Sequence, residues 1–244
     1  MITSFATALT KELDIYTPCI LEKGKVEQRK IHRRLFFLIE KIVLKTKDTF
    51  SNHQQEKLVQ ALRYSAKKHQ GVYRKDKVTP YFLHPLEVVL IILDLNILDF
   101  KIITAAILHD VVEDTDTTLK DISRLFGSGV RNIVDLMTKQ KLETNKEIYW
   151  LRIKRESDLN CKWRAIVLKF ADRIHYFMTS SAVPEENKKR HIDETLLEFP
   201  KLHTELRSTL SRLYLRGTLK NKKRIDEIVN GLQKRLTHEI HLHI

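Results

Sequence analysis

The segment "AAILHDVVEDTDTTL", residues 105–119, sets the interpretation of this chain. It begins as a buried apolar run, which His109 and Asp110 interrupt. Val111 and Val112 resume the apolar pattern before further carboxylates end it. Buried charges are costly unless they are paired or bind a metal ion. The segment therefore predicts a functional site inside the most apolar part of the chain.

The spacing of these charged residues suits one face of a helix. His109 and Glu113 are four residues apart, as are Asp110 and Asp114, and such pairs are neighbours on a helix surface. We therefore expect a helix over residues 100–112 whose continuation carries an imidazole and three carboxylates on one patch. These ligands suit a divalent metal such as Mn²⁺, and no cysteine is at hand to favour a thiophilic ion.

Two other motifs add ligand candidates. "PYFLHPL", residues 80–86, supplies His84, and "VLKFADRIHYFMT", residues 167–179, supplies Asp172 within an apolar helix pattern. Each residue alone has a plainer interpretation, as a core histidine, a helix cap or an intrahelical charge. The joint pattern favours a metal site with open coordination positions, as catalysis requires. The combined set is His84, His109, Asp110 and Asp172.

Composition predicts a helical globular protein. The chain has 244 residues, 42% of them hydrophobic and 31% charged, with only six glycines and five prolines. This length is enough to bury a substantial core. No segment shows sustained alternation of apolar and polar residues, so a dominant sheet is not expected. We predict an all-α fold.

The charge points to an anionic partner. The formal net charge is +13, and the basic residues are densest at 23–34 and 63–77. Nucleic acid, a membrane surface and phosphorylated small molecules all fit this charge. No apolar run is long enough to cross a bilayer, and the start does not have the pattern of a secretory signal. Cys19 and Cys161 are isolated, which favours a reducing cytoplasm.

Four stretches together resemble one known family. They are "RKDKVTPYFLHPLEVVLIIL" (74–93), "AAILHDVVEDTDTTLKDISRLFG" (105–127), "LMTK" (136–139) and "VLKFADRIHYFMT" (167–179). In this order and spacing they resemble the hydrolase domain of the RelA/SpoT family. That family is a helical HD-superfamily phosphohydrolase acting on the alarmones ppGpp and pppGpp. The resemblance runs from about Leu58 to Thr179.

The resemblance implies a reaction and assigns roles. It implies one Mn²⁺ per site on the four ligands above, with Glu113 and Asp114 orienting or deprotonating the attacking water. The reaction removes the 3′-pyrophosphate and gives GDP or GTP. A divalent metal lowers the pKa of bound water from about 15.7 to ~7–9. The residues expected to contact the nucleotide are Arg74, Lys75, Tyr81, Lys169, Tyr176 and Thr179.

Helical spacing in the first fifty residues and the resemblance over the middle of the chain together suggest a division of the chain. We expect an N-terminal helical extension over 1–50, an HD-type hydrolase domain over 51–200, and C-terminal helices over 201–244 that pack on the same domain. No length remains for a synthetase domain, so we expect a small stand-alone alarmone hydrolase, which could form a homo-oligomer.

Two positions depart from the family. The basic loop lacks the glycine that is common in the family. Tyr176 replaces the usual asparagine, either as a packing residue or as a selectivity position.

Two other interpretations remain open at this point. One is an HD phosphohydrolase for another nucleotide, such as the 2′-phosphate of NADPH or an adenine alarmone. The other is a basic helical module that binds nucleic acid and has only a structural metal. The second is disfavoured, because a structural site would not need Glu113 and Asp114, and the sequence offers no aromatic-basic interleaving typical of nucleic-acid surfaces.

Overall fold

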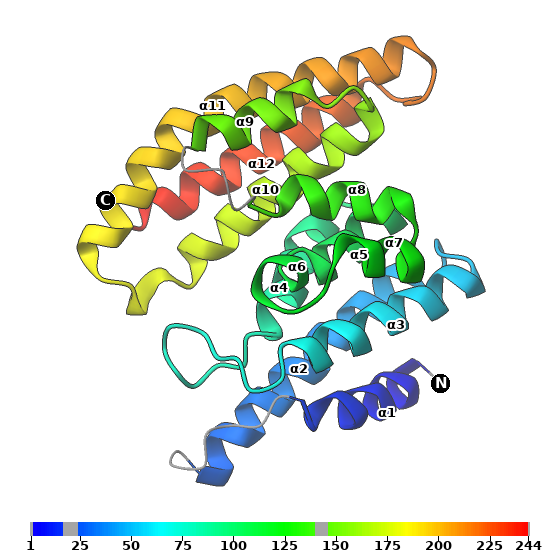
Figure 1. Ribbon diagram of the computed structural model, residues 1–244, viewed down its shortest axis with the longest axis vertical. Helices are drawn as coiled ribbons and strands as arrows, with labels where there is room; N and C mark the ends of the chain where they lie inside the picture. The colour runs from blue at the N-terminus through cyan, green and yellow to red at the C-terminus, as the bar shows by residue number, and fades with distance from the viewer. Residues whose placement is uncertain (1, 17–23, 140–145, 244) are drawn as a thin grey trace. The chain divides into compact units, whose positions relative to one another are not determined.

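The structure, a computed structural model, describes residues 2–16, 24–139 and 146–243. By internal contacts the chain forms two compact units, Met1–Val134 and Asp135–Ile244. In the described residues every regular element is a helix, and the one β-bridge joins Tyr73 to Pro80 (Figure 1). The prediction of an all-α fold is therefore confirmed.

The first unit begins with two helices that contact each other along the predicted N-terminal extension (Figure 1). Further helices follow, and α8 crosses the division between the units. The bounds are α1 Ile2–Asp14, α2 Gly24–Thr46, α3 Asn52–Lys68, α4 Leu83–Asp94, α5 Phe100–Leu108, α6 Val111–Asp114, α7 Leu119–Phe126 and α8 Ser128–Met137.

Local signals fix where several of these helices begin and end. Ser51 caps α3: its hydroxyl accepts from the Gln54 amide at 3.3 Å while the Gln54 side chain accepts from the Ser51 amide at 3.0 Å. Thr118 and Asp121 form the capping box of α7. Gly127 ends α7 with φ +88°, a conformation that only glycine adopts without strain.

The centre of the first unit is formed by α4 and α5, which contact each other. Both helices are apolar on nearly every face, and α5 is buried from Ile102 to Leu108. A helix that is apolar all round is expected in a core. Helices α2 and α3 cover this pair, α2 against α4 and α3 against α5. The polar residues at the ends of α4 and α5 are thereby held on a rigid support.

The second unit is a bundle whose longest helices lie side by side. Helix α10 contacts both α11 and α12 (Figure 1). Arg173 joins α10 to α11, because its Nη1 donates to Thr195 Oγ1 at 2.9 Å and to the His191 carbonyl at 3.2 Å. The bounds are α9 Lys146–Arg155, α10 Leu159–Met178, a 3₁₀ turn at Ser180–Ala182, α11 Glu185–Leu215 and α12 Lys223–His241.

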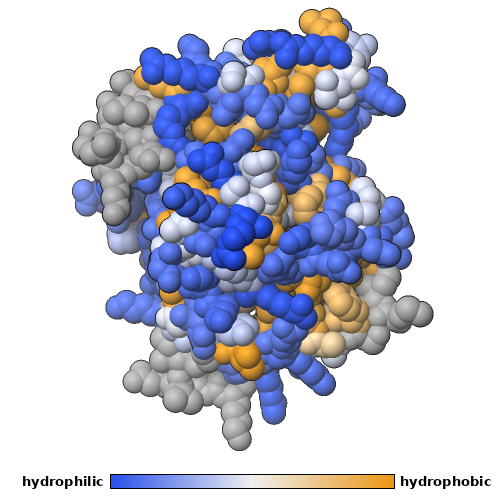
Figure 2. Space-filling view, turned by 45° about the vertical axis from the view of Figure 1, so that its right-hand side comes forward, coloured by the Kyte–Doolittle hydropathy of each residue, from blue (hydrophilic) through white to orange (hydrophobic). Residues whose placement is uncertain are grey.

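The surface matches the composition. Hydrophilic residues cover most of the face in Figure 2, and the hydrophobic residues on it are scattered. Among the described residues, the helices are each too short or too polar to cross a membrane.

Candidate active site

The helix that carries the motif is shorter than the sequence predicts. We expected one helix through residues 100–112, but α5 ends at Leu108 and α6 begins at Val111. The side chain of His109 explains the break, because its Nδ1 lies 2.8 Å from the Ala106 carbonyl oxygen. That carbonyl would otherwise accept the main-chain hydrogen bond that continues the helix to Asp110, and a side-chain donor competes with it.

The interruption brings two histidines and one carboxylate together. His109 Nε2 lies 3.1 Å from Asp110 Oδ2, and His84 Nε2 lies 3.4 Å from the same oxygen. The two imidazole rings are 5.2 Å apart between centroids, at an angle of 63°. Both histidines are buried, and His84 comes from the first turn of α4. Three of the four predicted ligands therefore converge within the first unit.

The hydrogen bond at Nδ1 fixes the form of the His109 ring. We assign the Nδ1 proton to the Ala106 carbonyl, because only a donor satisfies that oxygen. Nε2 is then the ring nitrogen that faces Asp110. Histidines that bind metals are oriented in this way, by a hydrogen bond from the other ring nitrogen. The donor set of two imidazole nitrogens and a carboxylate oxygen therefore fits a divalent metal ion.

Asp110 is held as a carboxylate. Burial alone would raise its pKa, but the neighbouring imidazoles of His109 and His84 hold the pKa well below its usual value. The Tyr81 hydroxyl also donates to Asp110 Oδ2 at 2.6 Å. A hydrogen bond to the charged form stabilises that form. Tyr81, predicted from the resemblance to contact the nucleotide, thus contacts a predicted metal ligand.

His69 is a residue that the sequence did not single out. Its ring stacks on Tyr81, with centroids 5.0 Å apart and an angle of 28° between the ring planes. Burial lowers its pKa, so the ring is held neutral. In the sequence, this histidine at the end of α3 belongs neither to an apolar helical repeat nor to one of the motifs quoted above. Only the three-dimensional position beside Tyr81 identifies it.

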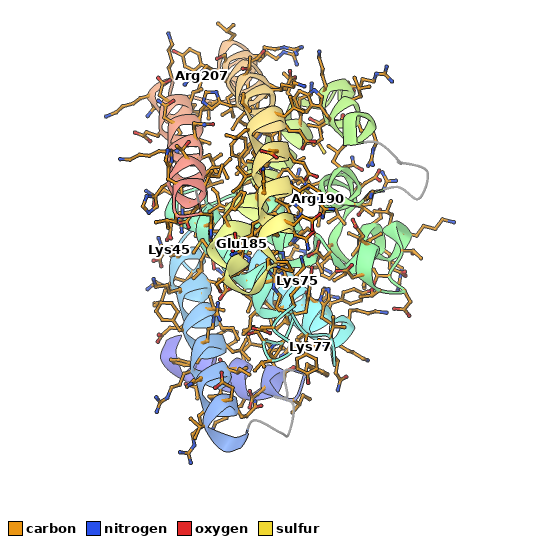
Figure 3. All side chains as sticks on the ribbon, turned by 90° about the vertical axis from the view of Figure 1, so that its left-hand side faces the viewer. Lys45, Lys75, Lys77, Glu185, Arg190 and Arg207 are labelled. Carbon is orange, nitrogen blue, oxygen red and sulfur yellow. The ribbon has the colours of Figure 1, made fainter. Side chains whose placement is uncertain are left out.

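The basic loop between α3 and α4 folds back on itself. The Tyr73–Pro80 bridge closes it, and the Arg74 amide donates to the Thr79 carbonyl at 2.8 Å. The Arg74 guanidinium lies over the Tyr81 ring, 5.7 Å from its centroid. Lys75 is exposed on the same loop, where Figure 3 labels it. The predicted cations therefore lie on the loop that leads into His84.

Asp76 and Lys77 shape the tip of this loop. Asp76 Oδ1 accepts from the Val78 and Thr79 amides, each at 2.8 Å. Lys77 adopts φ +57°, in the left-handed region that favours glycine. The glycine that the resemblance leads one to expect is thus missing from a loop that still uses a glycine-like conformation. The carboxylate of Asp76 holds that conformation by capping the turn.

The two predicted catalytic carboxylates lie on α6. The Asp114 amide donates to the Asp110 carbonyl at 2.9 Å, which ties α6 to the metal motif. Glu113 and Asp114 are both exposed on this short helix. Partial desolvation by neighbouring atoms, and then the charge of Asp110, raise the pKa of Asp114. Asp114 therefore combines proximity to Asp110 with a raised proton affinity.

The remaining predicted residues belong to the second unit. Asp172 Oδ2 lies 3.9 Å from Lys169 Nζ, one turn earlier on α10. The Tyr176 ring packs against His191, 4.3 Å away between centroids, and burial raises its pKa. Thr179 ends α10, with its hydroxyl donating to the His175 carbonyl at 2.9 Å. All of these contacts are made with other residues of the second unit.

Comparison with known proteins identifies the family. Residues 61–205 match the HD domain family. The chain is similar to a Xenopus tropicalis protein named guanosine-3′,5′-bis(diphosphate) 3′-pyrophosphohydrolase MESH1, at 38% identity over 48% of this chain and 66% of that protein. It is 37% identical to a Myxococcus xanthus GTP pyrophosphokinase over 54% of this chain and 18% of that protein.

A solved structure is also similar. It is described as a metazoan ortholog of SpoT that hydrolyzes ppGpp and plays a role in starvation responses, and its TM-score is 0.49 at 28% identity. The match covers 77% of this chain and 99% of that structure. The HD domain match includes both the His109–Asp110 pair and Asp172. The chain therefore belongs to the HD domain family, on the RelA/SpoT branch that its motifs indicate.

Proposed function

We propose that this protein is a metal-dependent hydrolase that removes the 3′-pyrophosphate of ppGpp and pppGpp, giving GDP or GTP and pyrophosphate. One observation carries the proposal: His84 and His109 direct their Nε2 atoms at one oxygen of Asp110. The names of the relatives support the substrate, since the Xenopus protein is named for this reaction.

We propose His84, His109, Asp110 and Asp172 as the ligands of a single Mn²⁺. The assignment of Asp172 rests on its motif and on the extent of the family match. Mn²⁺ is preferred because imidazole nitrogens and carboxylate oxygens together suit it better than Mg²⁺. When bound, a divalent ion lowers the pKa of a coordinated water and offsets negative charge on the phosphorus under attack.

The residues of α6 supply the proton acceptor. Asp114 has a raised pKa, which brings its proton affinity closer to that needed near neutral pH. Glu113 lies beside it on the exposed side of α6 and shares with Asp114 the role of orienting or deprotonating the water. The Tyr81 hydroxyl keeps Asp110 charged and fixed, so that the carboxylate does not compete for the same proton.

The loop at 71–82 binds the substrate. Arg74 offers a planar guanidinium for a purine base or a phosphate, and Lys75 adds a point charge for the polyphosphate. The nearby positive charge raises the association rate for a strongly anionic nucleotide. From their motif, Lys169, Tyr176 and Thr179 are proposed to contact the same nucleotide.

Other properties of the protein follow as proposals. The buried free thiol of Cys161 has its pKa raised to about 12 by burial, so it is suited to a reducing cytoplasm rather than to redox chemistry. A nucleotide substrate accounts for the positive charge, and we therefore propose no nucleic-acid partner. Association into a homo-oligomer is compatible with this function.

The proposed function is tested by product analysis. The protein is incubated with ppGpp in the presence of Mn²⁺ or of EDTA, and the nucleotides are separated by anion-exchange chromatography. We expect GDP and pyrophosphate in equal amounts only with the metal. A panel with NADPH and adenine alarmones runs alongside. Intact ppGpp after a long incubation with Mn²⁺, or release of orthophosphate, would contradict the proposal.

A further inference from the structure

His69 occupies a buried position next to the proposed metal ligands without being one of them. It ends α3, and only 2% of its surface is exposed. Its Nδ1 lies 3.0 Å from the Ser65 carbonyl, so that nitrogen carries the proton. Within the described residues, its Nε2 is buried with no hydrogen-bond partner. A buried polar atom without a partner is costly, which calls for an explanation.

The contacts of the ring point to a role in positioning its neighbour. His69 stacks on Tyr81 at 5.0 Å and 28°. The opposite end of Tyr81 donates its hydroxyl hydrogen to Asp110 Oδ2 at 2.6 Å. The His84 ring meets Tyr81 edge-on at 5.6 Å. Tyr81 is therefore fixed between the imidazoles of His69 and His84.

We propose that His69 is a positioning residue that acts through Tyr81 on Asp110. The stacked imidazole sets the plane of the tyrosine ring, and that plane aims the hydroxyl at Oδ2. This inference rests on the proposed role of Asp110 as a metal ligand and adds a residue that orients that ligand through Tyr81. Residues that orient a ligand in this way commonly change metal affinity or activity by about 10–100-fold when they are removed.

The chemistry of the stack favours a neutral histidine over other residues. Burial lowers the pKa of His69, so the ring carries no charge that would oppose a cation beside Asp110. Its Nδ1 hydrogen bond to Ser65 locks the ring against rotation. A phenylalanine would keep the flat stacking surface and lose only that lock. An alanine would remove the surface and leave Tyr81 free to change rotamer.

The experiment is a double-mutant cycle on the whole protein. The variants are His69→Ala, His69→Phe, Tyr81→Phe and His69→Ala with Tyr81→Phe, and Gln70→Ala, an exposed neighbour at the same helix end, is the matched control. Mn²⁺ affinity is measured by titration calorimetry, and hydrolysis by its kcat and KM. Thermal unfolding of the metal-free variants is recorded as a third readout.

We expect His69→Ala to weaken Mn²⁺ binding about tenfold. The same substitution in the Tyr81→Phe background should have little further effect, because the hydroxyl it positions is already gone. His69→Phe should retain nearly wild-type affinity, and Gln70→Ala should match wild type. Additive losses in the cycle, or His69→Phe as weak as His69→Ala, would overturn the inference.

Failure of the proposed function is visible separately. A wild-type protein that binds no Mn²⁺ contradicts the metal site before any variant is compared. The inference is then decided by the metal-free unfolding temperatures, which should show the same non-additivity between His69 and Tyr81. Additivity in that measurement overturns it.

Discussion

His109 and Asp110 are adjacent in sequence, yet His109 Nε2 and Asp110 Oδ2 lie only 3.1 Å apart. Neighbours inside a regular helix point about 100° apart around its axis, and such pairs do not face each other. Here the two side chains nevertheless meet, at the point where α5 ends at Leu108. His109 Nε2 and Asp110 Oδ2 are therefore placed to bind the same metal ion, and this can be tested.

The first prediction concerns the metal. We expect EDTA to abolish hydrolysis of ppGpp and Mn²⁺ to restore it more fully than Mg²⁺, because two of the proposed ligands are imidazoles. Asp110→Asn should lose both bound Mn²⁺ and activity. Metal content by elemental analysis, measured on the same samples as activity, checks this. Full turnover by protein shown to be free of metal would contradict the proposed metal dependence.

Glu113→Gln should separate catalysis from metal binding. The amide cannot accept a proton, and Glu113 is not among the proposed ligands, so Mn²⁺ content should stay at wild-type level. We expect kcat to fall by about 10²–10⁴-fold, as is usual for loss of a general base. If kcat is unchanged, Asp114 alone takes the proton.

Asp114 should control the acidic limb of the pH profile. Its pKa is raised, chiefly by partial desolvation, so its carboxylate is lost as the pH falls through a value above that of an ordinary aspartate. Activity that needs the carboxylate should decline on the acidic side of neutrality. In Asp114→Asn the remaining activity should lose that inflection. An identical acidic limb in the variant would assign it to another group.

Arg74→Ala should weaken substrate binding. The guanidinium lies over Tyr81 on the loop that leads into His84, so we expect KM for ppGpp to rise about tenfold, equal to about 1.4 kcal/mol. Metal content should not change. The effect should be larger at low salt, where charge attraction is less screened. Lys47→Ala, at an exposed cation just after α2, serves as the control for general loss of charge, and an equal effect there would contradict the local role.

Lys47 belongs to the turn that follows α2 and forms a 3.7 Å ion pair with Asp48, outside the basic loop. It therefore tests net charge without touching the loop.

Tyr176→Asn tests selectivity against packing. The ring packs on His191 in the second unit, at a position where the resemblance leads one to expect asparagine. If Tyr176 contacts the base, the substitution should shift the ratio of kcat/KM between guanine and adenine alarmones without removing the metal. If it is only a packing residue, the ratio stays fixed and the unfolding temperature falls.

The sequence predicts part of the site because charge inside an apolar run is conspicuous. His84, His109 and Asp110 interrupt apolar patterns, and the structure brings them to one oxygen atom. The helix break was not predictable from periodicity, because it depends on a side-chain bond from His109 to Ala106. His69 was missed since stacking on Tyr81 leaves no trace in spacing.

The two ends of the chain illustrate the same limit. We predicted helices over residues 1–50 and 201–244, and α1, α2, the end of α11 and α12 lie there. The division of the chain into domains stays a prediction. Domain boundaries depend on long-range contacts, which the spacing of residues along the sequence does not reveal.

The end of α5 at Leu108 has an electrostatic consequence. The peptide dipoles of a helix sum to about half a negative charge at its C-terminus. That end of α5 leads directly into His109 and Asp110. It adds to the field of the Asp110 carboxylate, attracting a cation and repelling the phosphates of a nucleotide. For the proposed function, this field favours an order of binding in which the metal arrives first and the nucleotide second.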